Sequence, residues 1–249
     1  MAEILSSTEL PAIRRDVELH PADGLTLVGE LALPETGAPV GTIVFLHPLP
    51  TAGGYMDSHV IRKAANRLPA LAQLAVLRFN FRGASSPRGT SEGALGHGVD
   101  EAFDLDAALR FVRENDLPTP WVVGWSFGTE VALNHALDHD VAGLILLAPP
   151  LHRTTAETLA KWNDRTETPI VALIPEHDDY LQATEARERF AVTPHVEVVE
   201  VEEGKHLWVG EKQTYRVLSE IVQRIDSLHA GGIVPRTLPR SRYSRQRRN

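Results

Sequence analysis

The sequence predicts an α/β fold in which a mostly parallel sheet is covered by helices on both faces. The chain has 249 residues, which is long enough for one large α/β domain. Apolar runs of strand length alternate with segments of helical periodicity, as in parallel strands joined by helical crossovers. These runs are continuously apolar instead of alternating, which indicates strands that are buried on both faces.

The predicted elements follow in order along the chain. Residues 15–20 and 25–33 form an N-terminal antiparallel hairpin, because Asp23-Gly24 supplies the positive φ that a tight reversal needs. The later strands are predicted at 42–46, 75–79, 121–125, 143–148, 169–174 and 196–201. The helices are predicted at 58–73, 100–113, 127–137, 155–162, 183–190 and 213–228.

The charge distribution divides the chain into a body and a tail. Residues 231–249 hold six arginines and no acid, begin with two glycines and lack periodicity, so they are predicted to be a disordered basic tail. The tail is either a solvated end or a contact for an acidic partner. We therefore expect an N-terminal extension at 1–14, one domain at 15–230 and the tail at 231–249.

Composition excludes several classes of protein. The body carries 33 acids against 19 bases, and a net charge of −14 repels nucleic acid. The chain has no cysteine, which excludes disulfides, thiolate metal sites and a cysteine nucleophile. No apolar run has the length of a signal peptide or a membrane span. We expect a cytoplasmic protein without metal or cofactor, and its oligomeric state cannot be read from the sequence.

The pattern Gly-x-Ser-x-Gly occurs twice, around Ser91 and around Ser126. A serine nucleophile on this pattern needs a buried strand before it and a helix after it, so that its hydroxyl stands exposed on a sharp turn. Ser126 has both, since Trp121-Val122-Val123 precede it and a helical segment follows. Ser91 lies in a polar loop and has neither. The context predicts Ser126 as the nucleophile and Ser91 as a loop residue.

Acyl transfer by a serine also needs two N–H donors for the developing oxyanion. The residue after the nucleophile, Phe127, is predicted to supply one backbone N–H. The second donor is expected in the segment His47-Pro48-Leu49-Pro50. Proline has no amide hydrogen, so Leu49 is the predicted donor between His47 and Thr51. A plain proline-rich turn is the alternative for this segment.

The nucleophile further needs a histidine base and a carboxylate that orients it. Of eleven histidines, His206 lies between the last predicted strand and the last predicted helix, where the base is expected. The carboxylate should follow the strand that ends at Ile174. Asp178 lies four residues beyond that end and is favoured, with Asp179 and Glu176 as alternatives.

These residues resemble a known group. The run His47-Pro48-Leu49-Pro50 with Gly53-Gly54 and Met56-Asp57, followed by Leu77 to Gly83, is similar to small uncharacterised hydrolases of the α/β-hydrolase superfamily, near the dienelactone-hydrolase and acyl-peptidase-like branches. The resemblance covers the chain from about Val17 to the final helix. It implies an eight-stranded, mostly parallel sheet and a Ser–Asp–His triad, carried here onto Ser126, Asp178 and His206.

The expected activity is hydrolysis of a small soluble ester. Residues 149–168, where this fold often inserts a lid, hold one short helical segment, so we expect no large lid and an open site. The expected partner is a small-molecule substrate, without nucleic acid or membrane. A non-catalytic scaffold of the same fold that binds a partner or small ligand is one alternative. Thioesterase or peptidase chemistry on the same triad is another.

Overall fold

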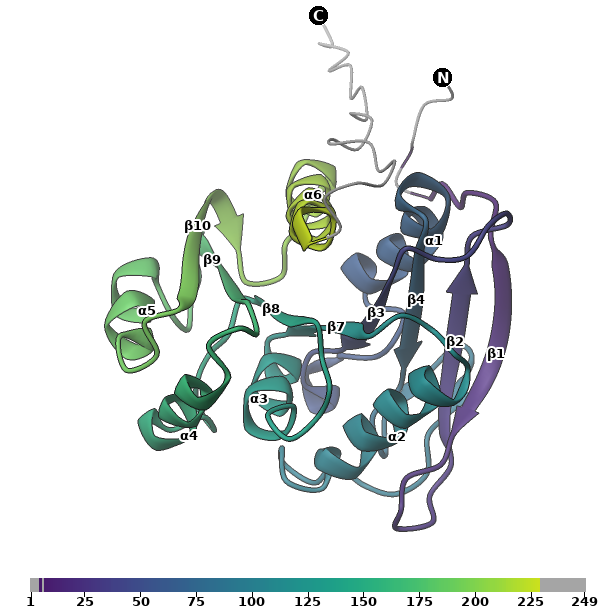
Figure 1. Cartoon of the computed structure of the whole chain (residues 1–249), viewed down its shortest axis with the longest axis horizontal. Helices are drawn as coiled ribbons and strands as arrows, with labels where there is room; N and C mark the ends of the chain where they lie inside the picture. The colour runs from purple at the N-terminus through teal and green to yellow at the C-terminus, as the bar shows by residue number, and fades with distance from the viewer. Residues whose placement is uncertain (1–4, 6, 229–249) are drawn as a thin grey trace, which may run out of the picture.

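The computed structural model describes residue 5 and residues 7–228, and an eight-stranded sheet runs through it (Figure 1). The predicted tail at 231–249 lies outside the described residues, as do residues 1–4 and 6 of the extension predicted at 1–14. The sheet order is β1-β2-β4-β3-β7-β8-β9-β10. Its strands are β1 (Ile13–Leu19), β2 (Leu27–Leu33), β3 (Gly41–Leu46), β4 (Leu74–Phe79), β7 (Pro120–Trp125), β8 (Gly143–Leu147), β9 (Ile170–His177) and β10 (Val196–Lys205).

The sheet is parallel from β4 to β10, and the N-terminal hairpin extends it in antiparallel fashion. β1 pairs with β2, and β2 pairs with β4, both antiparallel. The pairs β3–β4, β3–β7, β7–β8, β8–β9 and β9–β10 are parallel. The predicted eight-stranded, mostly parallel sheet with an N-terminal hairpin is therefore confirmed.

Helices cover both faces of the sheet (Figure 1). The α-helices are α1 (His59–Ala72), α2 (Glu101–Glu114), α3 (Phe127–His135), α4 (Ala156–Lys161), α5 (Ala183–Phe190) and α6 (Glu211–Leu228). Buried side chains of α1 and α6 pack in one core cluster, and those of α2, α3, α4 and α5 pack in another. Two short 3-10 helices, η1 (Pro50–Ala52) and η2 (Trp162–Arg165), complete the helical elements.

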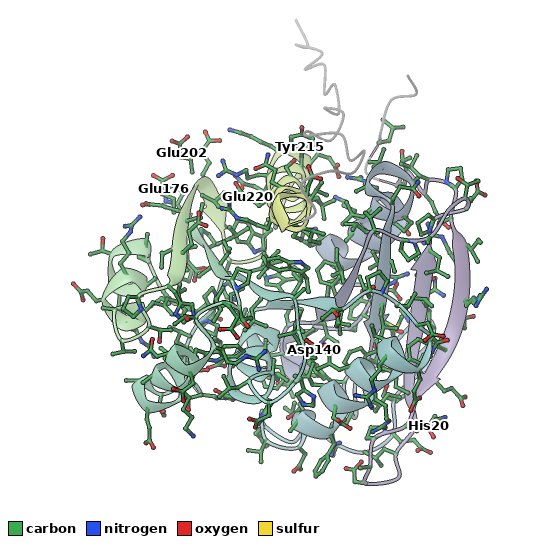
Figure 2. The ribbon with its side chains drawn as sticks, in the orientation of Figure 1. His20, Asp140, Glu176, Glu202, Tyr215 and Glu220 are labelled. Atoms are coloured by element: carbon green, nitrogen blue, oxygen red, sulfur yellow. The ribbon has the colours of Figure 1, made fainter. Side chains whose placement is uncertain are left out.

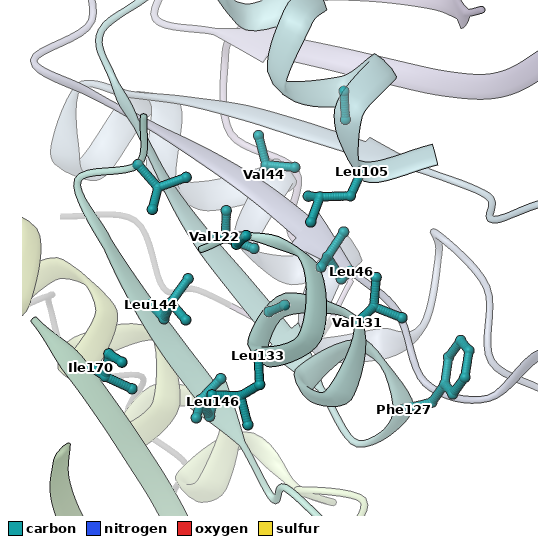
Figure 3. Close-up of a cluster of buried hydrophobic side chains, with 14 of the residues drawn as sticks. Val44, Leu46, Leu105, Val122, Phe127, Val131, Leu133, Leu144, Leu146 and Ile170 are labelled. Carbon is teal, nitrogen blue, oxygen red and sulfur yellow. The ribbon is translucent and has the colours of Figure 1, made fainter. Parts of the chain in front are cut away.

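The central strands send alternate residues into the two cores. Figure 3 shows Val44, Leu46, Val122, Leu144 and Leu146 packed with Val131 and Leu133 of α3. Their neighbours in sequence, such as Ile43, Val123 and Ile145, enter the opposite cluster. A strand with both faces buried has few positions for polar residues, which explains the largely apolar runs in the sequence.

The edge strand β10 and its neighbour β9 are longer than predicted. β9 continues to His177 and β10 continues to Lys205, beyond an irregularity between Val201 and Lys205. The added residues are mostly polar because these strand ends are exposed, and backbone pairing does not depend on apolar side chains there. A small hairpin of β5 (Ser85–Ser86) and β6 (Gly89–Thr90) also occupies a segment predicted as loop.

Ser91 follows that hairpin and has a structural role. Its side chain is 1% exposed. The Oγ hydroxyl donates to the Asn80 carbonyl at 2.7 Å and accepts the Val28 N–H at 3.0 Å. A hydroxyl that is buried and bonded to two backbone groups is not accessible to a substrate.

The segment between β8 and β9 contains only the short helices α4 and η2. Over residues 7–228, no helix is both long enough and apolar enough to cross a membrane.

Candidate active site

Ser126 occupies a sharp turn between a buried strand and a helix. β7 ends at Trp125, and α3 begins at Phe127. The backbone of Ser126 has φ 52° and ψ −116°, a strained conformation for a residue with a side chain. Its N–H donates to the Leu147 carbonyl at 2.9 Å, and its carbonyl accepts the Thr129 N–H at 2.9 Å. These bonds hold the turn in place on both sides of the serine.

The two glycines around Ser126 are required by close backbone approach. A Cβ on Gly124 would lie 2.5 Å from the Gly128 carbonyl oxygen. A Cβ on Gly128 would lie 2.2 Å from the carbonyl oxygen of Leu46, in the neighbouring strand β3. The Gly-x-Ser-x-Gly pattern at 124–128 therefore reflects a turn that is packed tightly against the sheet.

The side chains of Ser126, His206 and Asp178 form a hydrogen-bonded row. His206 Nε2 lies 2.8 Å from Ser126 Oγ. His206 Nδ1 lies 3.0 Å from Asp178 Oδ2 and 3.2 Å from Oδ1. An ionised carboxylate can only accept, so Nδ1 carries the hydrogen and Nε2 is left to accept from the Ser126 hydroxyl. Both His206 and Asp178 are buried.

Of the three acids considered from the sequence, Asp178 is the one within hydrogen-bonding distance of His206. Because β9 extends to His177, Asp178 follows the strand directly, and the four-residue reach expected from a strand ending at Ile174 is not needed. Glu176 instead accepts the Glu203 N–H at 2.7 Å and projects outward near Glu202 (Figure 2). Asp179 is exposed.

The Asp178 carboxylate is fixed by the turn that follows it. Its Oδ1 accepts the backbone N–H of Tyr180 at 2.8 Å and that of Leu181 at 3.3 Å. The Tyr180 ring then turns back onto the His206 imidazole, with ring centroids 4.5 Å apart and planes inclined by 59°. One short segment therefore orients the carboxylate and covers the histidine.

His206 is carried by a tight turn after β10. The Trp208 N–H donates to the Lys205 carbonyl at 2.8 Å, and Trp208 has φ 50°. The side chain of Trp208 is fully buried, whereas Leu207 is 55% exposed and Val209 is 68% exposed. The buried Trp208 anchors the turn, whereas the apolar side chains of Leu207 and Val209 face solvent.

The loop expected to supply an oxyanion donor is held by His47. Nε2 of His47 accepts the Phe81 N–H at 2.9 Å, so Nδ1 carries the ring hydrogen and donates to the Pro48 carbonyl at 2.6 Å. Complete burial lowers the pKa of His47 to about 4, although the bond to Pro48 opposes the shift. His47 is consequently neutral at pH 7.

This bond sets the direction of the Leu49 N–H. The N–H and C=O of a trans peptide point in opposite directions, so fixing the Pro48 carbonyl on His47 directs the Leu49 N–H away from it. Gly54 closes the loop, because its N–H donates to the Leu49 carbonyl at 3.0 Å and a Cβ there would lie 2.0 Å from the Pro48 oxygen. Within residues 7–228, neither the Leu49 nor the Phe127 N–H has a protein acceptor.

The sequence did not indicate the roles of the residues that support this site. Tyr180 and His47 have no motif of their own, although the position of His47 directly before Pro48 was the available signal.

No group of three or more His, Asp or Glu side chains in the part of the chain that the structure describes is arranged to hold a metal ion.

The fold and the site define an α/β hydrolase. The Alpha/beta hydrolase domain family matches residues 41–231, and the chain belongs to this family. The resemblance noted from the sequence is thereby confirmed.

Several proteins are similar to this chain. An uncharacterized protein of Rickettsia prowazekii is 30% identical over 118 residues, which are 46% of this chain and 47% of that protein. The match therefore spans about half the length of this curated relative.

Among solved structures, an α/β serine hydrolase homologue of Coxiella burnetii is 25% identical, with a TM-score of 0.69, over 84% of this chain and 96% of that one. A lidless α/β serine hydrolase of Xanthomonas campestris is 24% identical, with a TM-score of 0.70, over 91% and 100% of the two chains. A Pyrococcus furiosus esterase is 20% identical, with a TM-score of 0.68, over 88% and 92%. The last two likenesses concern the fold.

Proposed function

We propose that this protein is a serine hydrolase that cleaves a small, soluble carboxylic ester through an acyl-enzyme. The observation that carries the proposal is the row from Ser126 Oγ through His206 to Asp178, with 2.8 Å and 3.0 Å between the partners. A serine hydroxyl is a weak nucleophile until a neighbouring base takes its proton, and this arrangement supplies that base.

In the proposed reaction, His206 takes the hydroxyl proton as Ser126 Oγ attacks the ester carbonyl carbon. The backbone N–H groups of Leu49 and Phe127 stabilise the negative oxygen of the tetrahedral intermediate. The C–O bond to the alcohol then breaks, and His206 returns its proton to the leaving alkoxide. A water molecule then attacks the acyl-enzyme in the same way, with His206 taking its proton and returning it to Ser126 Oγ, and the acid and free Ser126 are released.

The size of the substrate is inferred from the segment between β8 and β9. It holds only α4 and η2, and an enzyme for long acyl chains needs an apolar cover over them. The Coxiella homologue is described as a serine hydrolase, which supports the same chemistry. The Xanthomonas protein is described as lacking a lid, which agrees with an open site.

Labelling with a fluorophosphonate probe tests the nucleophile. We expect the wild type to be labelled and Ser126→Ala to be unlabelled, because the probe reacts with an activated serine. Ser91→Ala is the matched control, since it removes the serine of the second Gly-x-Ser-x-Gly pattern. Circular dichroism of both variants verifies the fold, because Ser91 makes two buried hydrogen bonds.

The outcomes separate the candidate functions. An unlabelled, folded wild type would reject the serine hydrolase and favour a binding scaffold. Labelling that persists in Ser126→Ala would reject the nucleophile. If the enzyme is labelled, a panel of butyrate ester, butyryl thioester and butyryl anilide identifies the preferred leaving group, and preference for either of the last two would replace esterase by thioesterase or amidase activity.

A further inference from the structure

The turn that carries His206 is held by two side chains outside the Ser126–His206–Asp178 row. The indole N–H of Trp125 donates to the backbone carbonyl of His206 at 3.0 Å. The imidazole Nε2 of His59 lies 2.7 Å from the next carbonyl, that of Leu207. A carbonyl only accepts, so Nε2 of His59 carries the hydrogen and donates.

These two donors also contact each other. The rings of His59 and Trp125 meet edge to face, with centroids 5.4 Å apart and planes at 88°. Trp125 is 2% exposed, so its indole has little freedom to move. His59 lies at the start of α1, and Trp125 ends β7. The start of α1 and the end of the central strand β7 therefore hold two successive peptide groups of the turn.

The turn is held at its backbone by these two donors, whereas its imidazole is held by Asp178 and Ser126. It follows β10 at the edge of the sheet, after the irregularity that begins at Val201. The side chains of Leu207 and Val209 are exposed and contribute little packing. Rotation of the peptide at His206 would move Nε2 relative to Ser126 Oγ.

Trp125 precedes Ser126 in the chain. Its backbone pairs with Leu147 in β8, and the next N–H, that of Ser126, donates to the same Leu147 residue. Trp125, the last residue of the strand before Ser126, thus also holds the turn that carries His206. Trp125 therefore connects the two, through its backbone and through its indole N–H.

We propose that Trp125 and His59 are positioning residues that set the distance between His206 Nε2 and Ser126 Oγ. The proposal rests on the proposed serine hydrolase function. Neither side chain takes part in a proton transfer. They act by holding the two carbonyls, and misplacement of a catalytic group by about 1 Å can lower a rate about 100-fold.

Trp125→Phe and Trp121→Phe form a matched pair for the test. Both tryptophans lie in β7 and are at most 2% exposed, and both substitutions remove an indole N–H and leave a similar cavity. The Trp121 N–H has no hydrogen-bond partner within the described residues, whereas that of Trp125 holds His206. We expect kcat for the best ester to fall at least about 10-fold in Trp125→Phe, with KM nearly unchanged.

Trp121→Phe should retain kcat within about twofold at a similar melting temperature. Equal kcat values in the two variants would reject the role of Trp125, as would a loss in Trp125→Phe that appears only in KM. An inactive, unlabelled wild type would instead reject the proposed function itself, so the two failures are distinguishable.

His59 is tested by a conservative rescue. In His59→Gln the side-chain amide can donate from nearly the position of Nε2, and in His59→Leu no donor remains. We expect kcat to fall in His59→Leu and to recover most of its value in His59→Gln, with KM similar in both. If His59→Leu matched the wild type in kcat, His59 would have no part in positioning the turn.

Discussion

The two buried histidines at the site differ because of their neighbours. Both nitrogens of His47 are used within the protein, one by the Phe81 N–H and one by the Pro48 carbonyl. Its burial is complete, so no lone pair is available to a substrate. His206 has an acceptor nitrogen directed at Ser126 Oγ. The neighbours of His47 thus assign it to loop support, whereas those of His206 suit the proton transfer proposed for it.

The low pKa of His47 makes the free energy of unfolding depend on pH. Its pKa is about 4 in the folded chain and 6.5 ordinarily, so between these values the unfolded chain binds a proton that the folded chain does not. Stability from this group is present above pH 6.5 and is lost as the pH falls toward 4, by up to about 3 kcal/mol.

Comparison with His47→Asn isolates this effect. Asparagine does not titrate, and its amide can still donate to the Pro48 carbonyl. We expect the free energy of unfolding of the wild type to fall more steeply than that of the variant in urea titrations at pH 7, 5.5 and 4.5. Parallel curves for the two proteins would show that His47 is not the buried neutral group described here.

At the scale of secondary-structure elements, the site depends on the close packing of α3 against the paired strands β7 and β3. Gly128 allows the first turn of α3 to lie against the Leu46 carbonyl. The strain at Ser126 persists because the surrounding packing fixes it. The turn that carries Ser126 therefore has little room for added side-chain atoms.

Gly128→Ala should accordingly be strongly destabilising. The new Cβ would approach the Leu46 backbone to 2.2 Å, and overpacking of this kind typically costs about 1–3 kcal/mol or more. Gly24→Ala is the control, because Gly24 has φ +87° but open space around it, so only backbone strain of about 1 kcal/mol is added. Urea unfolding of both variants measures the difference. A smaller loss in Gly128→Ala than in Gly24→Ala would contradict the close packing.

The helices and strands also show how much of the fold and the site could be predicted from the sequence. The interior strands and α5 were predictable because burial on both faces or on one helical face leaves a periodic apolar pattern. The ends of β9 and β10 were not, since exposed strand residues there are polar and resemble a loop. Ser126, His206 and the acidic segment were found through chain order and strand ends. Trp125, His59 and Tyr180 could not be found, because their roles depend on contacts between segments far apart in sequence, such as the 81-residue separation of Trp125 and His206.

At the scale of the whole molecule, the N-terminal hairpin is joined to the parallel sheet by buried charges. The guanidinium of Arg78 in β4 donates to Glu30 in β2 at 2.9 Å and 2.8 Å, and it also contacts Asp57. Arg78 and Glu30 are each 1% exposed. The hairpin is thus an integral edge of the sheet, and the row of Ser126, His206 and Asp178 lies on the other side of β3, toward the β10 edge.

The architecture on that side predicts the preferred acyl length. With only α4 and η2 between β8 and β9, the acyl chain has little protein to cover it. We expect kcat/KM to be highest for p-nitrophenyl acetate or butyrate and to fall for longer chains. Assays below the micellar concentration of each ester provide the comparison. A clear preference for palmitate would refute the open-site interpretation.

The contacts of Trp125 have a spectroscopic consequence. The chain has four tryptophans, and each is at most 2% exposed, so all should emit at the short wavelengths of an apolar environment. Trp125 differs from the others in touching an imidazole and the carbonyl of His206. Subtracting the fluorescence of Trp125→Phe from that of the wild type isolates its emission. The fluorescence of Trp125 can therefore report on the site, because this residue directly precedes Ser126, the serine that is proposed to be acylated.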